Sequence, residues 1–193
     1  MISWNEVFSE GFNLWIRKYT SKSERYYECE ESLQYSLLRC FETVAGDKGL
    51  PPEGIQREAR IVGNTRVDFL LGNEVSFEVK FEPDYPSMPP TRKPVTNVVL
   101  KTPDKEIAKL AGLTSEEAQI RLYEVELDFL KLMAYKKNGI PHNYLLCLDE
   151  DGRLYRSLAK SFKTRQAKQF IIPWKSIYRG IDNKKVYYFL LHV

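Results

Sequence analysis

The sequence predicts a single-domain α/β protein. Its 193 residues are enough for one domain, and a content of 43% hydrophobic and 28% charged residues is typical of a globular chain. Apolar residues recur at helical spacing over residues 4–16, 28–45 and 114–138, whereas apolar and polar residues alternate over residues 65–71 and 75–81. This succession of helices and strands is the basis of the predicted fold class.

The N-terminal segment, residues 1–27, is predicted to form a packing helix. Ser3 and Glu6 have the spacing of a capping box, in which each side chain binds a free amide of the first turn. One side of this helix would be buried either against the domain or in a homodimer, and packing against the domain is the favoured interpretation. The apolar residues at helical spacing are Trp4, Val7, Phe8, Phe12, Trp15 and Ile16.

Residues 28–150 form the predicted core. A helix from Glu28 to Ala45 precedes three strands, and a second helix, from Thr114 or Ser115 to about Asn138, precedes another strand. Residues 151–193 are predicted to be a basic C-terminal β extension. The predicted strands are Ile55–Val62, Thr65–Leu71, Val75–Phe81, a short Val95–Leu100, and Tyr144–Leu148, with Phe170–Trp174 and Val186–Val193 in the extension.

Charge is unevenly distributed along the chain. Residues 1–90 hold 10 basic and 15 acidic side chains, whereas residues 91–193 hold 19 and 11. In residues 155–193, nine basic residues accompany the single acid Asp182, and aromatic residues are frequent. Such a distribution suits a protein that binds a polyanion in one region and holds cations in another. A solvated basic surface is the alternative.

Several classes of protein are disfavoured. The apolar stretches are too short to span a membrane, and the first residues lack a secretion signal, so a cytoplasmic protein is expected. Cys29, Cys40 and Cys147 are expected to be reduced core thiols. His142 and His192 are too few and too far apart in the sequence for a histidine-based zinc site.

The segment that carries the predicted chemistry is a β-hairpin. A three-residue loop over residues 72–74 pairs its strands so that one side is entirely apolar. The other side then carries Asp68 opposite Glu78 and Arg66 opposite Lys80. The apolar pairs in this register are Leu71 with Val75, Phe69 with Phe77, and Val67 with Val79.

Two carboxylates this close repel each other, so either one is protonated or a cation lies between them. Mg²⁺, a hard cation with oxygen ligands, is the usual occupant of such a site near phosphate. Lys80, on the same side as Glu78, would orient or deprotonate a water, or neutralise charge that develops on a phosphate in the transition state. The alternative is an exposed hairpin face with a salt bridge.

The order of helix, three strands carrying Asp68 and then Glu78-x-Lys80, helix and strand resembles the PD-(D/E)XK nuclease superfamily over about residues 28–150. Val67 stands where the motif has proline. The resemblance implies a restriction-endonuclease-like fold, in which helices flank a central mixed β-sheet. It also implies Mg²⁺-dependent cleavage of DNA, with Asp68 and Glu78 as metal ligands and Lys80 as a catalytic residue. Mn²⁺ is expected to substitute for Mg²⁺.

Members of this superfamily often carry another acid on the helix before the sheet, and Glu28, Glu30 and Glu31 compete for that position. Glu30 lies nearest to the buried stripe of the predicted helix, whereas the other two point away. A carboxylate that faces a core is costly unless it is paired or bound to a metal. Glu30 is therefore a predicted catalytic residue, with a solvated helix end as the alternative.

Residues outside the hairpin are candidates for contacts with nucleic acid. Gln119 and Tyr123, on one flank of the second predicted core helix, match the Gln-x-x-x-Tyr element of RecB-like exonuclease domains. The match implies contacts to the DNA backbone or to the active-site acid. The alternative function is a nucleic-acid-binding or scaffolding module on the same fold, without catalysis. Five basic residues are candidate phosphate contacts: Arg92, Lys93, Lys163, Arg165 and Lys168.

Overall fold

The computed structural model describes residues 2–21, 27, 29–84, 96–158 and 161–193. At its centre lies a six-stranded sheet with the order β1-β2-β3-β6-β8-β7. Strands β3 and β6 are parallel, and the other neighbouring strands are antiparallel, so the sheet is mixed and the predicted α/β class is confirmed. The strands are β1 (Ile55–Arg60), β2 (Arg66–Leu71), β3 (Val75–Glu82), β6 (His142–Asp149), β7 (Lys175–Arg179) and β8 (Lys184–His192).

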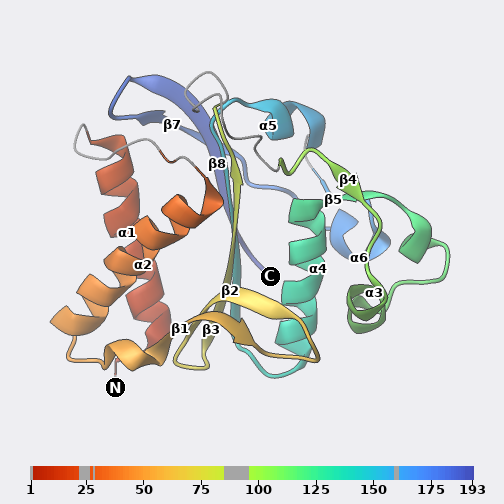
Figure 1. Cartoon of the computed structure of the whole chain (residues 1–193), viewed down its shortest axis with the longest axis horizontal. Helices are drawn as coiled ribbons and strands as arrows, with labels where there is room; N and C mark the ends of the chain where they lie inside the picture. The colour runs from red at the N-terminus through yellow and green to blue at the C-terminus, as the bar shows by residue number, and fades with distance from the viewer. Residues whose placement is uncertain (1, 22–26, 28, 85–95, 159–160) are drawn as a thin grey trace.

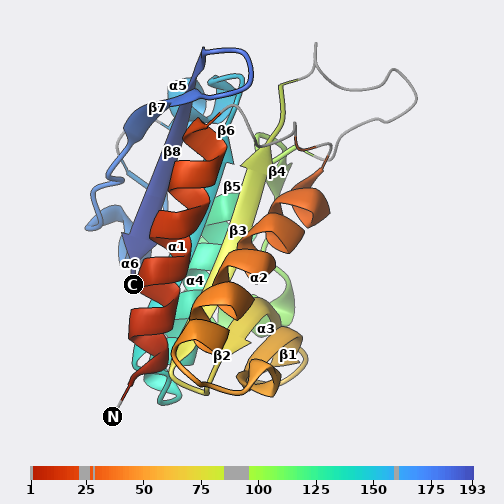
Figure 2. The ribbon, with the colours of Figure 1, turned by 90° about the vertical axis from the view of Figure 1, so that its left-hand side faces the viewer.

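Helices cover both faces of this sheet (Figure 1). The helices α1 (Trp4–Thr20) and α2 (Glu30–Asp47) lie side by side on one face (Figure 2). The helix α4 (Glu124–Lys137) covers the other face, and a separate apolar core lies on each side. The remaining elements are α3 (Lys105–Ala111), α5 (Arg153–Leu158), α6 (Arg165–Lys168), the paired short strands β4 (Leu100–Lys101) and β5 (Leu122–Tyr123), and the 3₁₀ turns η1 (Pro52–Gly54) and η3 (Glu117–Gln119).

The N-terminal helix forms as predicted. The hydroxyl of Ser3 accepts the amide of Glu6 at 3.2 Å, and the Glu6 carboxylate accepts the amide of Ser3 at 3.1 Å. The apolar side of α1 is buried within the chain, where the ring of Phe8 packs on Phe41 of α2 and Phe77 of β3. This side of the helix is therefore part of the core of the domain, as the favoured interpretation predicts.

The predicted hairpin register holds near the loop and fails beyond it. Leu71 pairs with Val75, and Phe69 pairs with Phe77, as expected. In the part of the chain that the structure describes, the ladder between β2 and β3 ends there, so the predicted pairing of Val67 with Val79 is wrong. The predicted backbone pairs of Asp68 with Glu78 and of Arg66 with Lys80 are likewise not part of this ladder. Val67 packs in the core beneath α4.

The side chain of Asp68 keeps the backbones of β2 and β3 apart. The carboxylate of Asp68 accepts the backbone amide of Val79 at 2.7 Å, and so takes the place of a strand carbonyl. Neighbouring β1 is also distorted, because Glu58 adopts a left-handed conformation with φ of 51° in mid-strand. The two strands therefore part at the residues that carry the predicted chemistry.

The predicted continuous helix over residues 114–138 is wrong. Thr114 and Glu117 do form a reciprocal cap, with hydrogen bonds of 3.2 and 3.0 Å. The turn ends after η3, however, because Glu117 is also bound by Gln166 of α6, and the chain then extends to pair as β5 with β4. The helix α4 begins only at Glu124. Of the predicted strand Val95–Leu100, only Leu100 lies in β4, and residue 95 lies outside the described residues.

The strands β7 and β8 of the predicted extension belong to the same sheet as the predicted core, since β8 lies between β6 and β7 and is antiparallel to both. The predicted strand Phe170–Trp174 is wrong: Ile171 makes only an isolated bridge with Ser161, and Pro173 has no amide for a ladder. Within the described ranges, no helix combines the length and the apolar character that crossing a membrane requires.

Candidate active site

Strand β3 has a free edge where β2 leaves it, and two carboxylates bind this edge. The amide of Val79 donates to Asp68 of β2 at 2.7 Å, and the amide of Phe81 donates to Glu30, in the first turn of α2, at 3.2 Å. These acids replace the carbonyls of a neighbouring strand. Asp68 and Glu30 are thus positioned by the backbone of the strand that carries Glu78.

Lys80 connects α2 to α4. Its Nζ lies 3.3 Å from Oε1 of Glu30 and 3.1 Å from Oδ2 of Asp128. Burial works against the charge of this ammonium, but the surrounding carboxylates, first Asp128 and then Glu30, outweigh it and raise the pKa of Lys80 well above its ordinary value. Lys80 is therefore a cation at neutral pH.

Lys131, one turn along α4 from Asp128, binds the same carboxylate from the other side. Its Nζ lies 2.7 Å from Oε1 of Glu78, 2.7 Å from Oδ1 of Asp128 and 3.3 Å from the carbonyl oxygen of Arg66. Burial favours the neutral form of Asp128, but Lys80 and Lys131 hold the pKa of that carboxyl below its ordinary value. Asp128 is therefore ionised and shared between two lysines.

The structure thus brings all four predicted catalytic residues into one group, which we call the carboxylate–lysine cluster. The side chain of Glu30 is 33% exposed, whereas the side chain of Glu78 is only 2% exposed. The cluster contains four carboxyl groups and two ammonium groups. The members of the cluster are Glu30, Asp68, Glu78, Lys80, Asp128 and Lys131.

Asp68 and Glu78 are two neighbouring buried acids, and the pKa of each is raised. Burial raises the pKa of Asp68, opposed by Lys80, by the amide of Val79 and by a hydrogen bond with Glu78. Burial also raises the pKa of Glu78, and the nearby Asp68 and Asp128 raise it further. Such a pair holds a proton between its members unless a cation replaces it.

The donor set of the cluster suits a hard divalent cation. Asp68 and Glu78 offer only oxygen, and Mg²⁺ commonly takes one or two carboxylates and completes its shell with water and substrate. No group of three or more His, Cys, Asp or Glu side chains arranged to hold a metal occurs among the residues that the structure describes. Within the cluster, Asp68 and Glu78 are the two adjacent carboxyl groups that could hold such a cation.

Asp128 and Lys131 are functional candidates that the sequence analysis missed. Asp128 lies at helical spacing between the apolar Val125 and Leu132, so a charged residue faces a buried stripe. The same argument, applied to Glu30, did find a member of the cluster. Applied to residues 124–137, it would have identified Asp128 as well.

The predicted nucleic-acid contacts are only partly brought together. Gln119 is exposed in η3 and Tyr123 lies at the end of β5, so their expected common flank on a helix is wrong. The ammonium of Lys163 lies 4.7 Å from the centre of the Tyr123 ring. Arg165 is exposed at the start of α6 and Lys168 at its end. Arg92, Lys93 and the competing Glu28 lie outside the described residues.

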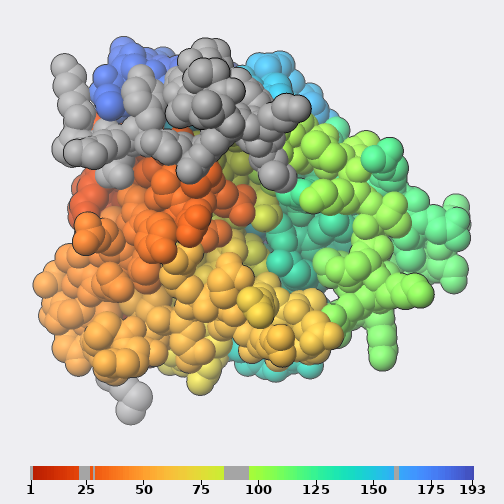
Figure 3. Space-filling view, viewed as in Figure 1, coloured from red at the N-terminus to blue at the C-terminus, as the bar shows by residue number. Residues whose placement is uncertain are grey.

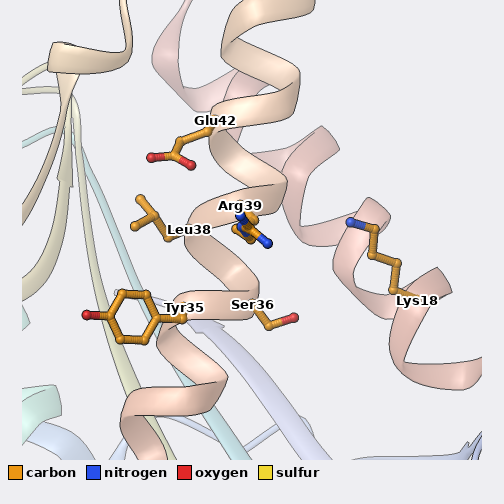
Figure 4. Close-up of a pocket in the computed structure, with 6 residues that line it drawn as sticks. All are labelled: Lys18, Tyr35, Ser36, Leu38, Arg39 and Glu42. Atoms are coloured by element: carbon orange, nitrogen blue, oxygen red, sulfur yellow. The ribbon is translucent and has the colours of Figure 1, made fainter. Parts of the chain in front are cut away.

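A second surface feature is separate from the cluster. A pocket lies along the exposed side of α2, next to Lys18 of α1, and no member of the cluster lines it (Figure 4). The pocket is lined by Lys18, Tyr35, Ser36, Leu38, Arg39 and Glu42.

On the side of the sheet that α4 covers, the surface of this helix is visible between the yellow strands and the green segment of β4 and α3 (Figure 3).

Fold and site together define an α/β protein with a buried carboxylate–lysine cluster, placed where two strands of its sheet separate. Comparison with models of known protein families, with curated proteins and with solved structures finds no match.

Proposed function

We propose that the protein is a metal-dependent nuclease that hydrolyses DNA phosphodiester bonds at the carboxylate–lysine cluster. One observation carries the proposal: Asp68, Glu78 and Lys80, from two strands that separate, meet in one cluster that holds more carboxyl groups than ammonium groups. The resemblance to PD-(D/E)XK nucleases supports it. The elements α2, β1, β2, β3, α4 and β6 follow one another in the order on which that resemblance rests, with β4, α3, η3 and β5 inserted between β3 and α4.

Asp68 and Glu78 would hold Mg²⁺. When bound, this cation would neutralise charge on the phosphate and lower the pKa of a water. Because its own pKa is raised, Lys80 acts as an ammonium that stabilises negative charge on the phosphate, rather than as a base. Glu30 and Asp128 orient that ammonium from either side, at 3.3 and 3.1 Å.

The C-terminal residues would supply contacts with the substrate. Lys163, Arg165 and Lys168 are exposed and carry the positive charge that a DNA backbone requires. Tyr123, beneath the ammonium of Lys163, offers an aromatic ring close to this charge. An unpaired base could stack there, since such stacking tolerates any sequence.

The test is cleavage of plasmid and single-stranded DNA in Mg²⁺ or Mn²⁺, with EDTA as the metal-free control. We expect wild-type cleavage that is lost in Asp68→Asn and in Lys80→Met. Lys137→Met, at an exposed position of α4, is the matched control and should cleave like the wild type. Circular dichroism checks that each variant is folded. Undiminished cleavage by both cluster variants would overturn the proposal.

A nucleic-acid-binding module without catalysis is the second candidate. It is favoured by Lys131, which already occupies the space between Glu78 and Asp128 as a cation. Calorimetric titration with Mn²⁺ separates the two candidates. Binding that disappears in Glu78→Gln supports the nuclease, whereas no binding, together with DNA affinity that falls steeply with salt and no turnover, supports the module.

A further inference from the structure

We propose that Lys131 is a built-in counter-ion of the carboxylate–lysine cluster, and that a divalent cation has to displace its ammonium from Glu78 in order to bind. The inference rests on the proposed function for the identity of the cation. It assigns to Lys131 a role distinct from that of Lys80: Lys131 would set how tightly the cluster binds the cation.

The contacts of Lys131 are those of a bound cation. An ammonium has three donors, and three oxygen atoms surround this one, two from carboxylates at 2.7 Å and one from the carbonyl of Arg66 at 3.3 Å. The side chain is only 16% exposed, so the charge is largely withdrawn from water. It has the partners and the enclosure of an ion in a site, but it is tethered to α4.

Lys80 differs in the acids that it binds. Among the described residues, its ion pairs are with Glu30 and Asp128, whereas Lys131 pairs directly with Glu78, one of the two candidate ligands. A cation that binds Glu78 therefore meets the ammonium of Lys131 first. Two positive charges this close repel each other strongly in a buried site. Lys131 has to move toward solvent while Lys80 keeps its own partners.

Two consequences follow from this arrangement. Without a cation, Lys131 stabilises the fold, because it neutralises acids that would otherwise be buried and unpaired. With a cation, the same ammonium competes for Glu78 and weakens binding. Removing the charge should therefore lower the stability of the metal-free protein and increase its affinity for the cation.

The test compares the wild type with Lys131→Met, which keeps the length of the side chain, at pH 8. In EDTA we expect a midpoint of thermal unfolding lower by about 5 °C or more. In calorimetric titration we expect Mn²⁺ to bind about tenfold or more tightly than in the wild type, a change typical in size for residues that support metal ligands. Lys131→Arg retains a cation and should bind Mn²⁺ no more tightly than the wild type. Lys137→Met controls for loss of a lysine from α4.

Equal or weaker Mn²⁺ binding by Lys131→Met would overturn the inference, as would an absence of binding in both proteins. If Lys131→Met is unfolded in EDTA, refolding on addition of Mn²⁺ supports the inference, and failure to refold overturns it. These outcomes are independent of cleavage. Tighter binding in a protein that cuts no DNA would refute only the proposed nuclease, and cleavage with unchanged affinity would refute only the role of Lys131.

Discussion

The ammonium of Lys80 on β3 lies 3.1 Å from a carboxylate oxygen of Asp128 on α4. The lysine of the Glu-x-Lys strand is therefore held by an acid on the helix that covers this face of the sheet. Because Asp128 also binds Lys131, at 2.7 Å, one carboxylate positions both ammonium groups of the cluster. The geometry of the proposed site thus depends on α4 as much as on the hairpin.

Replacement of Asp128 by asparagine should therefore impair the site. Lys80 and Lys131 would lose their common charged partner, and we expect the rate of DNA cleavage to fall by about 10- to 100-fold, as for other residues that support a metal site. Initial rates in Mg²⁺ measure the effect. Glu116→Gln, at an exposed position, is the control. An unchanged rate in Asp128→Asn would show that Asp128 does not position Lys80.

The stability of the metal-free protein should fall as the pH rises from about 5 to 7.5. Burial, aided by Asp68 and Asp128 and opposed by Lys80, raises the pKa of Glu30 from 4.5 to about 7. Between these values the folded state binds more protons than the unfolded state, so the free energy of unfolding decreases with rising pH. Asp68 and Glu78, whose pKa values are also raised, act in the same direction.

Urea unfolding in EDTA at pH 5 and pH 7.5 measures this dependence. Glu30→Gln cannot ionise and should reduce the difference in unfolding free energy between the two pH values. Glu31→Gln changes the neighbouring exposed acid and should leave that difference as in the wild type. A wild-type protein that is more stable at pH 7.5 than at pH 5 would contradict the prediction.

Gly11 is required where α1 packs against α2. A Cβ at this position would lie 2.5 Å from a ring carbon of Phe41, and that ring is held by Phe69 and Phe77 at centroid distances of 5.8 and 5.9 Å. We expect Gly11→Ala to lower the free energy of unfolding by about 1–3 kcal/mol, although alanine favours helices. Gly46→Ala in α2, with nothing within 4 Å, should instead raise it by up to about 1 kcal/mol.

Urea denaturation of both glycine variants gives the comparison. The two substitutions are chemically identical and both lie in helices, so opposite signs would isolate the effect of the contact with Phe41. Equal effects at Gly11 and Gly46 would mean that the two helices can move apart at little cost.

Arg179, at the end of β7, is 2% exposed and joins three acids. Its guanidinium nitrogens lie 2.6 Å from Glu150, 2.6 Å from Asp182 and 3.3 Å from Asp84. Arg179→Met would leave buried carboxylates without this partner, and we expect a loss of about 3–5 kcal/mol in the free energy of unfolding. Lys175→Met, exposed on the same strand, should change it by less than about 0.5 kcal/mol. Chemical denaturation measures both, and similar small changes would refute the structural role of Arg179.

Short-range patterns predict much of this molecule. The capping box of Ser3 and Glu6 forms, and the hairpin loop sets the pairs nearest to it. Each of these features depends on residues close together in the sequence, whose spacing already fixes their relative positions.

Long-range contacts decided the rest. The helix predicted over residues 114–138 is interrupted because η3 is bound by α6 and β5 pairs with β4. The backbone of Asp68 does not pair with Glu78 as expected, because the Asp68 carboxylate binds an amide of β3. Hydrophobic periodicity contains no information on such partners, since a break in a helix or ladder is compensated by groups distant in the sequence.

Local patterns are enough to assign the α/β class, the hairpin, and four of the six residues in the carboxylate–lysine cluster. Packing of α4 against the sheet adds Asp128 and Lys131 to this cluster, so that two ammonium groups lie among four acids. The physical reason is that the charge balance of a buried site is a property of every element packed around it. Here α2, β2, β3 and α4 each contribute charged side chains to the cluster.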